Sequence, residues 1–148
     1  MKILLVEDNQ DKINKIGAFL KEEFNDYYIE IKTSYQSALK EIMSNHSKYS
    51  LILLDISLPT YDVAPDEPGG EPMPLAGEGI LKEMYYADIM TNVIVVTMYV
   101  NFVDKTKIED LDKRFIEEYS DNYKGYVYFA SNQNSWKEKL KNKINALI

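Results

Sequence analysis

The chain has 148 residues, of which 45% are hydrophobic, and it carries a formal net charge of −7. Its length and hydrophobic content predict one folded domain over 1–148. No apolar run approaches the roughly 18 residues of a membrane span, and the first apolar run is too short for a signal peptide. The absence of cysteine and the single histidine exclude thiolate and histidine-rich metal sites. The acidic charge argues against nucleic-acid binding, so we expect a cytoplasmic protein with neither membrane nor nucleic-acid partners.

Strand-like and helix-like segments alternate along the chain. Short apolar runs predict strands at 3–6, 28–31, 51–54, 93–96 and 126–129. Apolar residues at three- and four-residue spacing predict helices at about 13–24, 35–43, 79–87, 105–119 and 135–147. Because parallel neighbours need crossover connections, this pattern predicts an α/β fold: a doubly wound five-stranded parallel sheet with helices on both faces.

Acidic and hydroxyl side chains follow the predicted strands. Glu7 and Asp8 follow the first strand, Asp55 the third and Thr97 the fourth. These strand ends meet at one edge of an open α/β sheet, where ligands bind. Three carboxylates repel one another unless a cation lies among them, and oxygen ligands suit Mg²⁺. The cluster suits phosphoryl transfer to Asp55, with Thr97 as a hydrogen-bond donor. Alternatively, Glu7 and Asp8 cap the first helix and Thr97 is an ordinary strand residue.

Three motifs occur in a characteristic order: ILLVEDN at the N-terminus, LILLDISLP in the middle and VIVVT later. Together they resemble the receiver domain of two-component response regulators, and the resemblance covers nearly the whole chain. It implies a flavodoxin-like fold and phosphorylation of Asp55 by a partner histidine kinase. Thr97 matches the switch hydroxyl of the family, and Tyr128 on the fifth strand matches its switch aromatic.

The resemblance also implies a magnesium site. Asp8 and Asp55 would hold Mg²⁺, Glu7 would assist them, and the main-chain carbonyl of Ser57 would be a further ligand. On this basis Asp55 and Thr97 are the catalytic residues, and any enzymatic activity is limited to self-phosphorylation and autodephosphorylation at Asp55.

The sequence departs from the family at the cation of the site. Receivers carry a lysine after the fifth strand that contacts the phosphoryl group, whereas alignment on Tyr128 puts Ser131 at this position. Lys124 lies before the predicted strand, and Lys105 beyond the fourth strand is only a conceivable substitute. A serine brings no charge, so we expect weaker stabilisation of a phosphoryl group.

Two further departures concern access to Asp55. Met98 stands where the family prefers a small residue and should narrow the entrance. The glycine that opens the next helix is matched by Gly77, so a long loop rich in proline, glycine and acids is inserted at about 60–76. It is either a lid or partner-binding loop, or a solvated acidic excursion. Its acids are candidates to approach the metal: Asp62, Asp66, Glu67 and Glu71.

A second extended segment lies at about 99–124, on the surface that receivers use to signal. Tyr99, Phe102 and Val103 near its start are either an exposed patch for a partner or a second copy, or core residues beneath a lengthened helix. We favour the core interpretation.

Two hypotheses follow. The first is a stand-alone receiver, phosphorylated on Asp55, that signals through a surface change to a separate effector or as a homodimer. The second is an atypical receiver that acts as a protein-interaction module with little or no phosphorylation. The intact acidic residues favour the first hypothesis, whereas Ser131, Met98 and the two extensions favour the second. No output domain is expected after Ile148.

Overall fold

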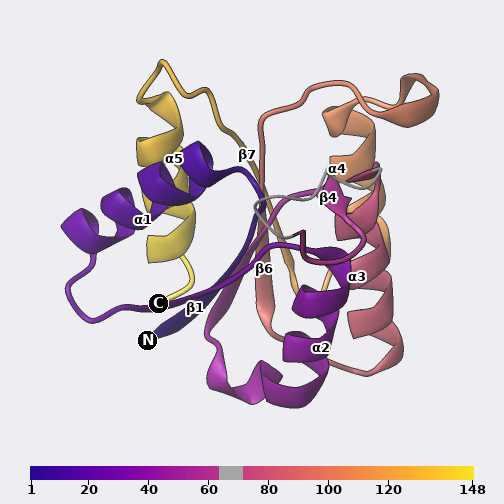
Figure 1. The fold of residues 1–148 in the computed structure, drawn as a ribbon, viewed down its shortest axis with the longest axis horizontal. Coiled ribbons are helices and arrows are strands. Elements are labelled where there is room, and N and C mark those ends of the chain that lie inside the picture. The colour runs from indigo at the N-terminus through magenta and orange to yellow at the C-terminus, as the bar shows by residue number, and fades with distance from the viewer. Residues whose placement is uncertain (64–71) are drawn as a thin grey trace.

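The computed structural model describes residues 1–63 and 72–148. At its centre is a parallel sheet (Figure 1). The strand order is β2-β1-β3-β6-β7. Its strands are β1 (Lys2–Val6), β2 (Tyr28–Lys32), β3 (Leu51–Leu54), β6 (Asn92–Thr97) and β7 (Tyr123–Tyr128). This arrangement confirms the predicted α/β fold with a doubly wound, flavodoxin-like five-stranded sheet.

Helices cover both faces of the sheet. One face carries α1 (Gln10–Glu23) and α5 (Ser135–Asn145), and the other carries α2 (Tyr35–Asn45), α3 (Ala76–Tyr86) and α4 (Ile108–Glu118) (Figure 1). Successive residues of a strand point to opposite faces. In β1, accordingly, Leu4 and Val6 enter the core beneath α2, α3 and α4, whereas Ile3 and Leu5 enter the core beneath α1 and α5. Burial on both faces explains the continuous apolar runs of the central strands.

The first turn of α1 is fixed close to the end of β1. Asn9 caps the helix, because its side chain accepts a hydrogen bond from the main-chain nitrogen of Lys12 at 3.0 Å. Only three residues separate the last residue of β1 from the first residue of α1. This short connection places the start of α1 directly over the carboxyl ends of the strands.

Some element boundaries differ from those predicted. Helix α3 begins at Ala76 rather than near 79, and α4 begins at Ile108 rather than near 105. Strand β7 begins at Tyr123, so Lys124 lies within the strand and not before it, and the extended segment predicted at 99–124 ends earlier. The apolar pattern did not reveal where β7 begins. Strand β7 lies at the edge of the sheet, and its pairing with β6 is irregular between Val93 and Val95.

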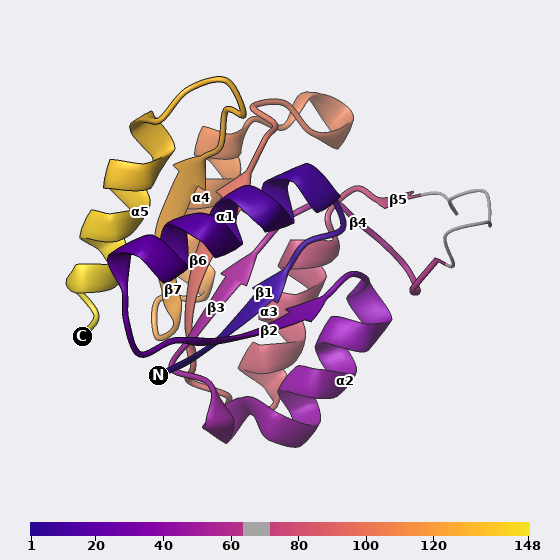
Figure 2. The same cartoon turned by 60° about the vertical axis from the view of Figure 1, so that its left-hand side comes forward.

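The predicted loop at 60–76 contains regular structure at its end. Pro72–Met73 form β5, which pairs antiparallel with β4 (Leu58–Pro59) (Figure 2), and Ala76 already belongs to α3. The expectation of an irregular loop up to 76 was therefore wrong at its C-terminal end. Proline is tolerated in such a pair because each strand has a free edge.

Asp62 does not approach the acidic cluster, contrary to expectation. Its Oδ1 accepts hydrogen bonds from Thr33 Oγ1 at 3.1 Å and from Ser37 Oγ at 2.8 Å, at the start of α2. One donor precedes α2 and the other lies in its first turn, so this carboxylate is bonded at the N-terminus of α2, where a negative charge is stabilised. The other acids predicted to approach the metal lie outside the described residues: Asp66, Glu67 and Glu71.

Of the three apolar residues near the start of the second extended segment, two are exposed and one packs against the core. Tyr99 is 52% exposed and Val103 is 43% exposed, whereas Phe102 is half-buried against the core. The core interpretation therefore holds for Phe102 alone. Tyr99 and Val103 are exposed because they lie in the loop before α4, in which Asn101 and Lys107 form an isolated bridge. Among the helices that the structure describes, none is long and apolar enough to cross a membrane.

Candidate functional site

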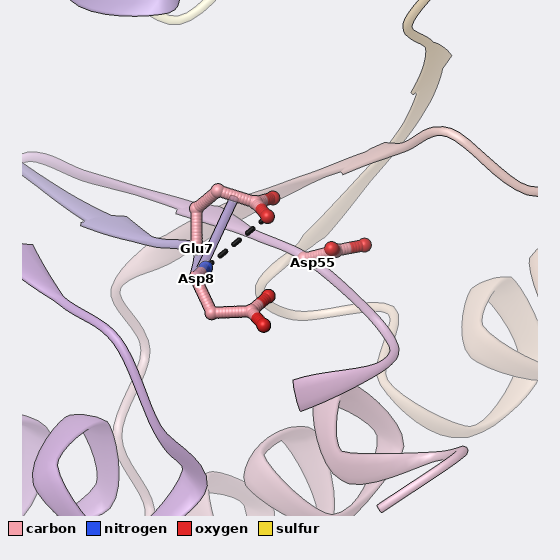
Figure 3. A group of neighbouring side chains, drawn as sticks. All are labelled: Glu7, Asp8 and Asp55. Atoms are coloured by element: carbon pink, nitrogen blue, oxygen red, sulfur yellow. Dashed lines mark hydrogen bonds between the residues drawn. The ribbon is translucent and has the colours of Figure 1, made fainter. Parts of the chain in front are cut away.

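The strand register places Glu7 beside Asp55. Val6 pairs with Leu54 across β1 and β3, and the next main-chain nitrogen, that of Asp55, donates a hydrogen bond to the carbonyl of Val6 at 3.1 Å. Glu7, Asp8 and Asp55 each offer a carboxylate oxygen, and these oxygens lie within 4.8 Å of one another (Figure 3). The structure thus brings together the three acids that the sequence predicts to form a site.

These acids lie at one cleft of about 460 Å³. Glu7 and Asp55 are almost fully buried, whereas Asp8 is exposed. Ser57, which was predicted to offer its carbonyl to the metal, also lines the cleft, as do Met98 and Pro72 of β5. A small ligand therefore reaches the carboxylates from solvent, between the end of β6 and the β4–β5 pair.

Two carboxylates are held in place by main-chain donors. Glu7 Oε1 accepts hydrogen bonds from the nitrogens of Asp8, at 3.1 Å, and Asn9, at 3.0 Å, with the first of these drawn in Figure 3. Asp55 Oδ1 accepts one from the nitrogen of Ile56 at 2.8 Å. The turns after β1 and β3 therefore orient both side chains without help from a ligand.

The predicted switch residues occupy different environments. Thr97 is fully buried at the end of β6, and its Oγ1 accepts a hydrogen bond from the nitrogen of Tyr99 at 3.1 Å. Tyr128 ends β7 with 43% of its surface exposed. A hydroxyl that accepts one hydrogen bond keeps its own proton to donate, so Thr97 retains a donor for a ligand.

Ser131, the position of the missing lysine, faces α1 instead of the acids. Its hydroxyl donates to Asp11 Oδ2 at 2.9 Å, and the ammonium of Lys15 donates to its carbonyl at 3.1 Å. Lys105, the conceivable substitute, is exposed in the 3-10 helix Val103–Lys105. Neither position supplies the positive charge at Asp55 in the described structure.

Lys12, which the sequence analysis missed, supplies that charge. Its side chain is fully buried, with Nζ 2.5 Å from Glu7 Oε2 and 3.4 Å from Asp55 Oδ2. The same Nζ donates a hydrogen bond to the carbonyl of Val96 at 2.7 Å. Side chains on a helix lean toward its N-terminus, so a lysine in the first turn of α1 reaches back to the strand ends.

The charges of the site are unbalanced. Burial raises the pKa of Glu7 to about 7; Lys12 opposes this rise and the charge of Asp55 adds to it. Burial, followed by the charge of Glu7, also raises the pKa of Asp8. One ammonium thus faces three carboxylates, an excess of negative charge that favours a further cation.

The raised pKa of Glu7 predicts a pH dependence of stability. Between the ordinary value of 4.5 and about 7, folded Glu7 keeps a proton that the unfolded chain has lost. The contribution of Glu7 to the free energy of unfolding should therefore fall as the pH rises through this range. Urea unfolding at several pH values, without divalent metal, should show a flatter pH profile for Glu7→Gln than for the unmodified protein. Identical pH profiles for the two proteins would contradict a raised pKa of Glu7 in the folded state.

The donor set fits Mg²⁺. Carboxylate and main-chain carbonyl oxygens are the ligands that Mg²⁺ prefers, and opposite ligands of its octahedron lie about 4.2 Å apart. The carboxylate oxygens of Glu7, Asp8 and Asp55 lie within 4.8 Å of one another, a separation comparable to that distance. No sulfur or imidazole belongs to this group of acids, so the cluster is suited to a hard cation.

Comparisons with known proteins show which chains this one resembles. No family model matches the chain. It is 32% identical to the Detocs response regulatory protein DtcB of Enterobacter cloacae over 99% of this chain and 100% of that protein. Among solved structures, it matches the receiver domain of a LuxO repressor protein from Vibrio parahaemolyticus with a TM-score of 0.67 and 23% identity, covering 99% and 88% of the two chains.

A second similar structure was solved as a complex with ligands. The response regulator TrrA of Thermotoga maritima, in complex with Mg²⁺ and BeF, matches with a TM-score of 0.65 and 21% identity over 99% of this chain and 98% of that one. Full-length similarity to DtcB at 32% identity, combined with the observed fold, shows that the chain belongs to the response regulators and is built as their receiver domain.

Proposed function

We propose that this response regulator accepts a phosphoryl group on Asp55 in a Mg²⁺-dependent reaction with a partner histidine kinase. The observation that supports this most directly is the cluster of Glu7, Asp8 and Asp55, whose oxygens lie within 4.8 Å of one another beside an open cleft. Membership of the response regulators supports a kinase and a separate effector as partners. The protein would act in the cytoplasm and pass its signal to the separate effector or, alternatively, act as a homodimer.

The chemistry requires a metal and an acceptor. Asp8, Asp55 and the carbonyl of Ser57 would hold Mg²⁺, with Glu7 assisting, and the bound metal would neutralise charge on the transferring group. A carboxylate oxygen of Asp55 attacks phosphorus while the bond from phosphorus to the donor breaks, and its electron pair leaves with the donor. The reaction then needs only positioning and charge neutralisation from the protein.

The signal would begin at Thr97. Its hydroxyl proton is free to be donated to a phosphoryl oxygen, and movement toward Asp55 would break its contact with the nitrogen of Tyr99. Such a movement would shift the exposed Tyr99 loop, and Tyr128 on the neighbouring strand could follow, since Thr97 pairs with Tyr128. Local electrostatic events of this kind change a surface that partners recognise.

Intact mass spectrometry tests the proposal. After incubation with acetyl phosphate, the unmodified protein should gain one phosphoryl group when Mg²⁺ is present and none when Mg²⁺ is chelated. Asp55→Asn should gain none. Asp62→Asn is the matched control, because Asp62 is hydrogen-bonded at the start of α2, and this variant should gain one phosphoryl group like the unmodified protein.

An adduct that survives in Asp55→Asn would disprove Asp55 as the acceptor. A protein that takes no phosphoryl group, either from acetyl phosphate or from its kinase, would instead be the interaction module. Met98 at the cleft and Ser131 turned toward α1 are the observations that favour that second function.

A further inference from the structure

We propose that Lys12 is the cation that binds the phosphoryl group on Asp55, so that α1 takes the role that the lysine after the fifth strand has in other receivers. The inference rests on the proposed function, because it concerns the group that Asp55 would accept. It assigns a role in the reaction to a residue outside the motifs that identify the family.

The position of Lys12 is central to the site. Its Nζ lies between Glu7, which follows β1, Asp55, which follows β3, and Val96 near the end of β6. The separation from Asp55 Oδ2, 3.4 Å, is the longest of the three. Phosphorylation would add negative charge at Asp55 beside an ammonium that is already in place, and charge-assisted contacts of this kind are the strong ones.

The alternative cations are turned elsewhere. Lys15, one turn further along α1, is bound to Asp11 and to Ser131. Lys105 is exposed beyond β6. Within the described part of the chain, Lys12 is the lysine that forms an ion pair with Asp55.

Lys12 is also preorganised. Its main-chain nitrogen is bound by the cap residue Asn9, and Nζ lies 6.0 Å from the centre of the Phe129 ring, within the range of a cation–π contact. A buried ammonium held by fixed partners needs little reorganisation when charge develops next to it. Its bond to the carbonyl of Val96, the residue before Thr97, also connects the cation to the predicted switch.

Two binding measurements separate a phosphoryl-binding role from a structural one. Mg²⁺ affinity is measured by calorimetry, and beryllofluoride, a mimic of the phosphoryl group, is then titrated into the Mg²⁺-loaded protein. Lys12→Met should bind Mg²⁺ at least as tightly as the unmodified protein, because a positive charge has left the cluster. Its affinity for beryllofluoride should fall by about tenfold or more, because a hydrogen bond to a charged group would be lost.

Two variants make the test specific. Lys15→Met removes a lysine from the same helix without touching Asp55 and should leave both affinities unchanged. Adding Ser131→Lys to Lys12→Met returns a lysine to the position that other receivers use and should restore part of the beryllofluoride affinity. Should Lys12→Met fail to fold, the side-chain NMR signal of Lys12 in the unmodified protein should shift on addition of beryllofluoride, while that of Lys15 does not.

Each other outcome has a distinct meaning. Parallel losses of Mg²⁺ and beryllofluoride affinity in Lys12→Met would overturn the inference in favour of a structural role, as would unchanged beryllofluoride affinity or an unshifted Lys12 signal. Failure of the unmodified protein to bind beryllofluoride with Mg²⁺, and to form the Asp55 adduct, would reject the proposed function and this inference together.

Discussion

Replacing Gly77 by alanine is expected to lower the free energy of unfolding by about 3 kcal/mol. A Cβ at this position would lie 2.6 Å from the carbonyl oxygen of Asp55 and 2.9 Å from the Cα of Ile56. Both are main-chain atoms, so no side-chain rotation can relieve the overlap. The close approach is also held by a hydrogen bond from the nitrogen of Gly77 to the carbonyl of Ile56 at 2.9 Å.

Gly17→Ala is the matched control for this prediction. Gly17 also lies within a helix, but apart from its chain neighbours and the backbone of its own helix no atom would come within 4 Å of an added Cβ. Alanine is favoured over glycine in a helix by about 1 kcal/mol, so this variant should be more stable than the unmodified protein. Urea unfolding should give changes of opposite sign at the two glycines. A Gly77→Ala protein as stable as the unmodified one would show that α3 does not need this close approach.

Replacing Lys12 by methionine, in the absence of divalent metal, is expected to lower the free energy of unfolding by about 3 kcal/mol, because breaking a buried ion pair leaves an uncompensated charge. Glu7 and Asp55 would then face each other in the core without a cation. Methionine keeps most of the length of the lysine chain, so the loss reports the charge more than the packing.

Two comparisons check this interpretation. Lys15→Met removes an ion pair at the surface of the same helix, where such pairs contribute little, and should unfold at nearly the same urea concentration as the unmodified protein. The double variant Lys12→Met/Glu7→Gln removes both charges of the closest pair and should recover part of the lost stability. If the second substitution adds a further loss, the cost of Lys12→Met does not arise from the unpaired acid.

The central strands could be predicted from the sequence because burial on both faces leaves an unmistakable pattern. Leu51–Leu54 is apolar at every position and was predicted with the bounds that the structure has. Strand β7 at the edge of the sheet is mixed in character, with Lys124 and Gly125 within it, and its start was misplaced. Tyr99 and Val103 were misjudged for another reason, since apolar residues in a loop have no periodicity that reveals which way they face.

The candidate site could be predicted in its acidic half only. Parallel strands bring their carboxyl ends together whatever the connections between them, so Glu7, Asp8 and Asp55 could be grouped from the strand pattern. The cation could not be found in the same way, because it comes from a helix. The sequence nevertheless contained an indication of this lysine. Lys12 has the helical spacing of Ile16 and Phe19, which places it on the buried face of α1. A lysine at a core position of a helix indicates a buried partner, since a charge is rarely buried alone.

The contacts of Lys12 also bear on how the protein folds. Its ammonium joins the turns after β1 and β3 to a carbonyl of β6 that is 84 residues away in the chain. A contact over such a separation forms only after the intervening chain has been ordered, because loop closure opposes it. A partly folded chain that lacks β6 would hold the acidic residues but not the complete site. Binding competence should therefore appear late in refolding, together with the docking of β6 onto β3.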